Sequence, residues 1–191
     1  MFTFLLSIIV IFITSYSYGI FFKKFFIKSN KDLVFNLGET IILGYFFLLI
    51  ISLLFHFFIP INYFFTIFIL LIALCYFSLN FYTLLKFNLK NLLIIFSISF
   101  LGFVSSKSHP DFEWYHLPYL NYLQNYKIVF GIGNLSDFLG YSQTWNDIIG
   151  IFRIPIVDYR VANFAPIIFL ISIVYSILHF ANISKFHYVK V

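Results

Sequence analysis

The stretch "LVFNLGETIILGYFFLLIISLLFHFFI", from Leu33 to Ile59, decides the fold class. It is long and apolar enough to cross a bilayer as one α-helix, because about 20 apolar residues cover the roughly 30 Å of hydrocarbon. Its one carboxylate, Glu39, lies near one end of the run, where a charged side chain can reach the membrane interface. The stretch therefore predicts a membrane-spanning helix.

Similar apolar runs lie on both sides of this stretch. The whole chain is 62% hydrophobic and only 10% charged, whereas a soluble domain carries about 25% charged residues. The sequence predicts an all-α, polytopic transmembrane bundle of about five spans. The further predicted spans are Phe2 to Phe22, Tyr63 to Leu79, Leu89 to Ser105, and Phe164 to Phe180 with Pro166 near its first turn.

The cations are placed at the ends of these runs. Lysines follow the first, third and fifth predicted spans, and with five spans all of them fall on one side of the membrane. By the positive-inside rule that side is the cytoplasm, so the N-terminus is expected outside and the C-terminus inside a bacterial inner (plasma) membrane. The net charge of +5 is explained by this placement, and no nucleic-acid partner is expected. The lysines concerned are Lys23, Lys24, Lys28, Lys31, Lys86, Lys90, Lys185 and Lys190.

The scheme divides the chain into a four-span region (1–105), an extracytoplasmic loop (106–163), and a fifth span with a basic cytoplasmic tail (164–191). The loop is too long for a plain connector and too rich in aromatic residues for a disordered one, so we expect it to be folded on the membrane surface. We expect one interfacial helix from about Tyr115 to Tyr126 and a second short helix from Trp145 to Phe152, capped by Ser142.

The loop begins with "SSKSHPDFEWYHLPYLNYLQ", Ser105 to Gln124, in which Asp111, Glu113 and His116 lie close together. From the residues alone, these carboxylates are either solvated loop residues near a helix N-terminus or the polar part of a site. No metal-binding spacing is present, and the single cysteine, Cys75, excludes a disulfide within the chain. No metal site or cofactor is predicted.

The stretch "DFEWYHLPYLNYLQNYKIVFGIGNLSDFLGYSQTW" resembles the first large outer loop of bacterial polytopic proteins related to the GT-C glycosyltransferase superfamily. The matching pieces, in order, are Asp111, Tyr115-His116-Leu117, Gly131-Ile132-Gly133-Asn134-Leu135, Gly140 and Trp145. The resemblance implies a transferase that takes a sugar from a polyprenyl-phosphate donor on the outer face of the membrane.

The resemblance also implies roles for individual residues. It implies that Asp111 acts as the catalytic base or binds a metal, with Glu113 as the second candidate, and it places Tyr115, His116 and Asn134 at the substrate. Two arginines in the same loop, Arg153 and Arg160, are candidates for binding the leaving phosphate, and headgroup anchoring is the other interpretation of both.

The superfamily usually has more spans than this chain supplies. We therefore expect a fragment or shortened relative, with a second membrane chain as a possible partner that completes the bundle. The alternative function is a non-catalytic membrane scaffold or a subunit of an envelope-assembly complex. A transporter is less favoured, because the predicted spans contain few ionisable residues: Glu39, His56 and His179.

Overall fold

The computed structural model describes residues 2–27, 35–85, 93–94, 97–98, 112–134, 144–153 and 161–188. Every regular element in this part of the chain is helical, and it contains no strand, which confirms the all-α expectation. The longer helices are α1 (Phe2–Phe26), α2 (Leu37–His56), α3 (Tyr63–Leu85) and α8 (Val161–Tyr188). The shorter ones are η1 (Phe112–His116), α5 (Leu117–Asn125), η2 (Ile132–Asn134) and α7 (Thr144–Phe152).

Four of the helices are long and apolar enough to cross a membrane: Leu5–Phe26, Leu37–His56, Tyr63–Tyr82 and Phe164–Ala181. They coincide with four of the predicted spans and indicate a membrane protein. The remaining predicted span, Leu89 to Ser105, lies almost wholly outside the described residues. Helix α8 begins earlier than expected, at Val161, so Pro166 lies inside the helix rather than in its first turn.

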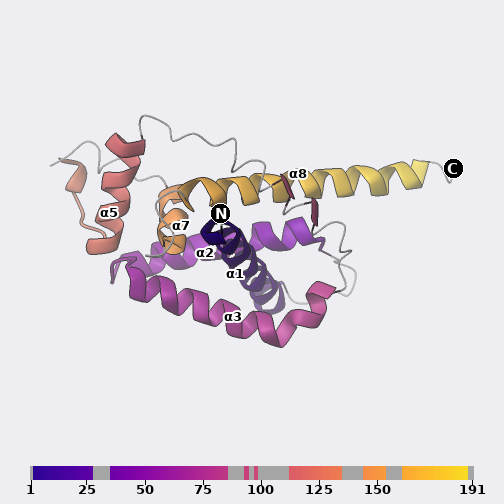
Figure 1. The fold of residues 1–191 in the computed structure, drawn as a ribbon, viewed down its shortest axis with the longest axis horizontal. Coiled ribbons are helices and arrows are strands. Elements are labelled where there is room, and N and C mark those ends of the chain that lie inside the picture. The colour runs from indigo at the N-terminus through magenta and orange to yellow at the C-terminus, as the bar shows by residue number, and fades with distance from the viewer. Residues whose placement is uncertain are drawn as a thin grey trace.

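The directions of the long helices follow from contacts between them. Helices α1 and α2 are antiparallel. Ser15 of α1 lies against Gly44 of α2, whereas Gly19, further along α1, lies against Thr40, which comes earlier in α2. Figure 1 shows α2 and α3 as two long arms joined by a tight turn, with α1 crossing beside them and α8 along the other side of α2.

Helices α1 and α3, by contrast, run in the same direction. The Tyr18 hydroxyl donates to the Ile69 carbonyl at 3.1 Å, and further along both helices Lys24 Nζ donates to Asn80 Oδ1 at 2.6 Å. Helix α8 is antiparallel to α2, because Tyr45 bonds to Ala165 near the start of α8 and Asn36 bonds to Ser176 further along it. Helices α1, α3 and α8 therefore share one direction and α2 has the other.

One end of this bundle is marked by Lys23, Lys24, Asn36 and Asn80, and we call it the lysine end. The N-terminus of α2 is closed here by a capping box, in which the Asn36 side chain accepts from the Glu39 N–H at 2.9 Å and the Asn36 N–H donates to Glu39 Oε2 at 2.8 Å. Such a box satisfies two backbone donors that have no partner in the helix itself. Glu39 is therefore a helix cap, which agrees with a position near an interface.

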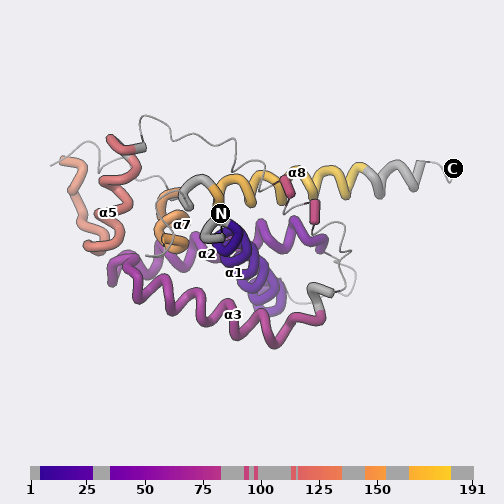
Figure 2. Tube along the Cα trace, viewed as in Figure 1, coloured from indigo at the N-terminus to yellow at the C-terminus, as the bar shows by residue number. Residues whose placement is uncertain are grey.

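The α2–α3 turn lies at the opposite end, and α5 is attached to it by backbone hydrogen bonds (Figure 2). The predicted helix from Tyr115 to Tyr126 is present as η1 followed directly by α5, with Pro118 in the first turn of α5. Proline is tolerated there because the first N–H groups of a helix have no intrahelical partner. Helix α7 confirms the second short helix, and the predicted cap Ser142 lies outside the described residues.

Candidate functional site

Helix α7 is short and buried on every side, which is unusual for a segment of a loop. It packs against α2, α3, α5 and α8, and every residue from Asn146 to Phe152 is buried. A short helix has little stability of its own, so its position depends on these packing contacts. Its sequence "TWNDIIGIF" consists mainly of isoleucine and aromatic residues, which suit a packed position.

Aromatic rings fix the side of α7 that faces α2 and α8. Tyr45 of α2 stacks on Trp145, with ring centroids 6.1 Å apart and planes 10° apart, and it also lies 6.4 Å from Phe152. Phe169 of α8 closes the cluster, 5.2 Å from Tyr45 and 5.4 Å from Trp145. The Tyr45 hydroxyl donates to the Ala165 carbonyl at 2.9 Å, so this buried phenol is satisfied.

Two polar side chains of α7 are buried within this packing. Asn146 and Asp147 are each only 2% exposed, and within the described part of the chain the Oδ1 atom of each has no hydrogen-bond partner. On α5, the buried Nε2 of Gln124 also has no partner among the described residues. Native proteins pair the large majority of buried polar atoms, so unpaired ones call for a specific explanation.

Burial also determines the protonation of Asp147. It raises the pKa of the Asp147 carboxyl from 3.8 to about 7, because the charged form loses its hydration. A carboxyl group that titrates near neutral pH can both take and give a proton under physiological conditions, which an ordinary surface aspartate cannot. Asn146 and Asp147 together offer buried oxygen acceptors that suit hydroxyl or N–H donors.

The adjoining helix α5 is held by a network of backbone hydrogen bonds. The Ile61 N–H donates to the Leu123 carbonyl at 2.8 Å, and the Ile128 N–H donates to the His56 carbonyl at 2.9 Å. His56 is buried, and its Nε2 lies 3.0 Å from the Tyr126 carbonyl oxygen. These bonds attach the segment after α5 to the α2–α3 turn.

Tyr122 completes this attachment. Its hydroxyl accepts from the Val129 N–H at 2.8 Å and donates to the Lys127 carbonyl at 2.9 Å, so one side chain holds the segment that leaves α5. The Leu120 and Leu123 side chains are fully buried beside it. The predicted apolar face of α5 therefore packs against protein.

Residues 1–190 match DUF8201, described as a domain of unknown function. The chain belongs to this family. No curated protein and no solved structure matches it. The DUF8201 match covers all the helices from α1 to α8, so the buried α7 helix and its carboxyl group are part of the family's domain.

The residues predicted as a catalytic and substrate site are only partly within the described chain. Asp111 and Arg160 lie outside the described residues. Glu113 is exposed on η1, the helical turn that also contains Tyr115, and Asn134 is exposed at the end of η2.

The other two predicted residues lie where α5 begins and where α7 ends. His116 is half-buried at the junction of η1 and α5. Arg153, also half-buried, follows α7, and its Nη1 donates to Asn121 Oδ1 on α5 at 2.9 Å. The contact that the structure shows for Arg153 therefore ties α7 to α5.

Asn146 and Asp147 were not predicted from the sequence as site residues. The available signal was their position in "TWNDIIGIF", where adjacent amide and carboxyl side chains interrupt an otherwise apolar short helix. In the parts of the chain that are described, no three His, Cys, Asp or Glu side chains are grouped as metal ligands would be.

Proposed function

We propose that the chain crosses the membrane about five times. The support comes from the helix directions, because α3 ends at the lysine end whereas η1 and α5 lie at the opposite end, beside the α2–α3 turn. The chain has to pass from one end of the bundle to the other between Leu85 and Phe112. A span over Leu89 to Ser105 provides that passage and places α8 in the same direction as α1 and α3.

The proposed orientation puts the lysine end in the cytoplasm of a bacterial inner membrane, with the N-terminus outside. The supporting observation is that Lys23 and Lys24 lie at the same end as the capped start of α2, which the positive-inside rule assigns to the cytoplasm. Helices α5 and α7 then belong to the extracytoplasmic loop.

The exposed aromatic residues around α5 favour an interfacial position for this loop. Trp114 on η1 and Tyr126 and Phe130 after α5 are 75%, 60% and 85% exposed, although the Leu120 face of α5 is buried. Exposed aromatic rings are typical of the headgroup region, where an apolar ring with a polar edge is best accommodated.

The proposed activity is the transfer of a sugar from a polyprenyl-phosphate donor to an acceptor hydroxyl at this outer face. The acceptor oxygen bonds to the anomeric carbon, the bond from that carbon to the polyprenyl phosphate breaks, and the hydroxyl proton passes to a carboxylate. Asp111 is the proposed base and Glu113 the second candidate, on the resemblance described above. Positioned carboxylates accelerate such steps by taking the proton as the new bond forms.

The observation that best supports a site in this loop is the buried pair on α7. Asn146 and Asp147 each supply an acceptor oxygen that has no hydrogen-bond partner among the described residues, at the end of the bundle where the loop lies, and burial raises the pKa of the Asp147 carboxyl to about 7. Such acceptors suit the hydroxyl groups of a sugar. The proposed roles of Tyr115, His116, Asn134 and Arg160 rest on the resemblance and on their place in the loop.

The second candidate function is a non-catalytic scaffold or subunit that works with another membrane chain. The hydrogen bond from Arg153 to Asn121 favours it, because this arginine holds α7 to α5 in the structure. An arginine that joins two helices does not need a phosphate ligand.

The two functions are separated by an assay of sugar transfer in membranes that contain the chain and a polyprenyl-phosphate sugar. Asp111→Asn keeps the size of the side chain and removes the base, so transfer is expected to fall by about 100-fold or more, and Glu113→Gln is expected to have a milder effect. Protein level in the membrane is the control and should not change, since loop substitutions of this kind have small effects on stability. Full transfer in the double variant contradicts catalysis by these carboxylates, and no transfer by the wild-type chain favours the scaffold.

A further inference from the structure

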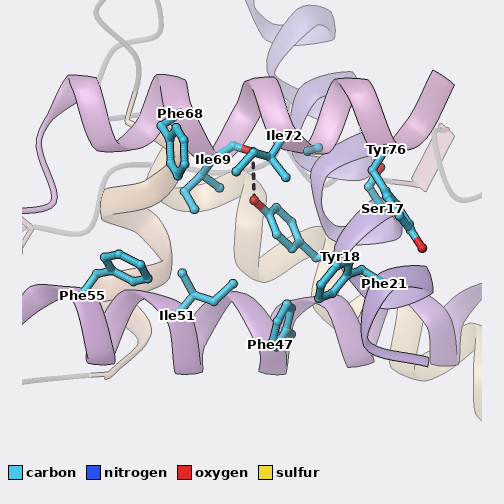
Figure 3. Close-up of a pocket in the computed structure, with 11 residues that line it drawn as sticks. Ser17, Tyr18, Phe21, Phe47, Ile51, Phe55, Phe68, Ile69, Ile72 and Tyr76 are labelled. Carbon is cyan, nitrogen blue, oxygen red and sulfur yellow. Dashed lines mark hydrogen bonds between the residues drawn. The ribbon is translucent and has the colours of Figure 1, made fainter. Parts of the chain in front are cut away.

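A cavity of about 320 Å³ lies between α1, α2 and α3. Figure 3 shows side chains of α2 and α3 facing one another across it, with Tyr18 of α1 reaching to the backbone of α3. Its lining is almost entirely carbon. The residues that line the cavity include Phe21, Phe55, Phe68, Ile72, Ala73 and Tyr76.

The cavity lies at the depth of the membrane hydrocarbon. All of its lining residues belong to the helices that are long and apolar enough to span a bilayer. From Phe68 to Tyr76 it follows nine residues of α3, a rise of about 12 Å at 1.5 Å per residue. One leaflet contributes about 15 Å of hydrocarbon, half of the roughly 30 Å core.

The cavity is open toward the side of the bundle. Phe55, Phe68 and Ile72 line it and are also 45%, 56% and 40% exposed on the helix surface. An apolar cavity of this kind does not hold water, because water needs polar partners. The molecule that reaches a side opening at this depth is the hydrocarbon chain of a lipid.

A cation lies at the end of the cavity. Phe21 and Tyr76 form an edge-to-face pair there, with ring centroids 5.6 Å apart. Lys24 Nζ lies 5.5 Å from the centre of the Tyr76 ring and 2.6 Å from Asn80 Oδ1. Lys24 is exposed and an ammonium group has three donors, so donors remain for a ligand after the bond to Asn80.

We propose that this cavity binds one anionic phospholipid from the leaflet at the lysine end. An acyl chain fills the space between α2 and α3, and the headgroup phosphate meets the Lys24 ammonium. The length of the cavity, its side opening and the cation at its end each match a part of that molecule. The site lies away from the loop that contains Asp111 and does not depend on the proposed transferase activity.

The test is native mass spectrometry of the purified chain with vesicle lipids, either phosphatidylglycerol or phosphatidylcholine. Ala73 is 1% exposed and lines the cavity, so Ala73→Phe is expected to fill the cavity and abolish retention of a single bound lipid of either kind. Leu74→Phe is the matched control, because Leu74 is the next residue and is 50% exposed. It should retain lipid as the wild type does.

Charge is tested separately from the cavity. Lys24→Gln keeps a polar, hydrogen-bonding side chain and removes the cation, so it should lower the preference for phosphatidylglycerol over phosphatidylcholine about fivefold, the equivalent of about 1 kcal/mol for one cation near an anionic headgroup. Lys127→Gln, at an exposed cation beyond α5, is the control and should leave the preference unchanged. Wild-type lipid retention in Ala73→Phe, or an unchanged preference in Lys24→Gln, overturns the proposal. It is equally overturned if cysteines placed at Ile72 and Ile94 crosslink efficiently in the bilayer, since the chain itself would then cover the opening.

Discussion

At the scale of single residues, Asp147 couples the stability of the bundle to pH. The folded chain holds the Asp147 proton up to a pH of about 7, whereas an unburied aspartate loses it near 3.8. Because the folded-state pKa is raised, the favourable contribution of this group is complete below about pH 4. It is lost as the pH rises toward 7 and changes little above that.

Asp147→Asn is therefore expected to remove a pH dependence rather than simply to destabilise the chain. A shift of about three pKa units corresponds to about 4 kcal/mol, and the amide has the shape of the protonated acid without its ionisation. The variant should melt at a higher temperature than the wild type at pH 8 and at nearly the same temperature at pH 3, where the carboxyl is protonated in both the folded and the unfolded chain. Thermal unfolding in detergent across this pH range measures it. Parallel melting curves for the two chains at every pH would contradict the burial argument, and Glu113→Gln, at an exposed carboxylate, is the control.

Tyr122 is the second residue whose role is specific enough to test. Tyr122→Phe keeps the ring and removes the hydroxyl that bonds to the Val129 N–H and the Lys127 carbonyl. Each such hydrogen bond contributes about 0.5–1.5 kcal/mol, so the loss of both should raise local opening of this segment about fivefold or more. Trypsin cleavage after Lys127 should accelerate accordingly, and Tyr126→Phe, at a 60% exposed ring, should not change it. Equal cleavage rates in both variants would show that the hydroxyl does not hold the segment.

At the scale of helices, the packing of α1 against α2 depends on glycine. A Cβ at Gly44 would overlap the carbonyl oxygen of Ser15, and one at Gly19 would overlap that of Thr40. Small residues allow this close approach of backbones, which is a common way of packing helices in membranes.

Gly44→Ala is accordingly expected to push α1 and α2 apart and to cost about 1–3 kcal/mol, as overpacking typically does. Gly150 provides the matched control. A Cβ there would meet Leu123 Cδ1 at 3.5 Å and Ile61 Cγ2 at 3.6 Å, which are ordinary contacts. Gly150→Ala should be neutral or stabilising, since alanine favours a helix over glycine by up to about 1 kcal/mol. Thermal stability in detergent compares the two, and equal melting temperatures would argue against close α1–α2 packing.

The short helices show how far sequence can predict this fold. The position of Pro118 and the spacing of Leu120 and Leu123 predicted α5, because both are local properties of the chain. The surface against which α5 packs was not predictable, because packing on lipid and packing on α7 both require the same apolar face of α5. The buried Asp147 was hidden for a similar reason, because α7 packs against four other helices, of which α2 and α3 lie far away in the sequence. Local periodicity identifies helices and leaves open what covers them.

At the scale of the whole molecule, the helix directions constrain the path of the chain. Helices α1, α3 and α8 share one direction, and α5 and α7 lie at the end opposite to Lys24. Each crossing of a membrane reverses the side on which the next segment lies. With the five crossings proposed above, the number of crossings from the start of α1 to the end of α8 is odd, and the two termini are then expected on opposite sides.

The topology with five crossings can be tested with reporter fusions. Fusions after Lys28 and Val191 should behave as cytoplasmic, and a fusion after Ser142 should be extracytoplasmic, because α3 and α8 are parallel and the loop lies between them in the sequence. A periplasmic phosphatase, which is active only outside the cytoplasm, should thus be active at Ser142 alone, and a cytoplasmic fluorescent reporter should give the complementary pattern. Activity of the phosphatase at Lys28 would reverse the assigned orientation. Phosphatase activity at both Ser142 and Val191 would show that α8 does not cross the membrane. Equal phosphatase activity at Lys28 and Ser142 would show that the segment from Leu89 to Ser105 does not cross it.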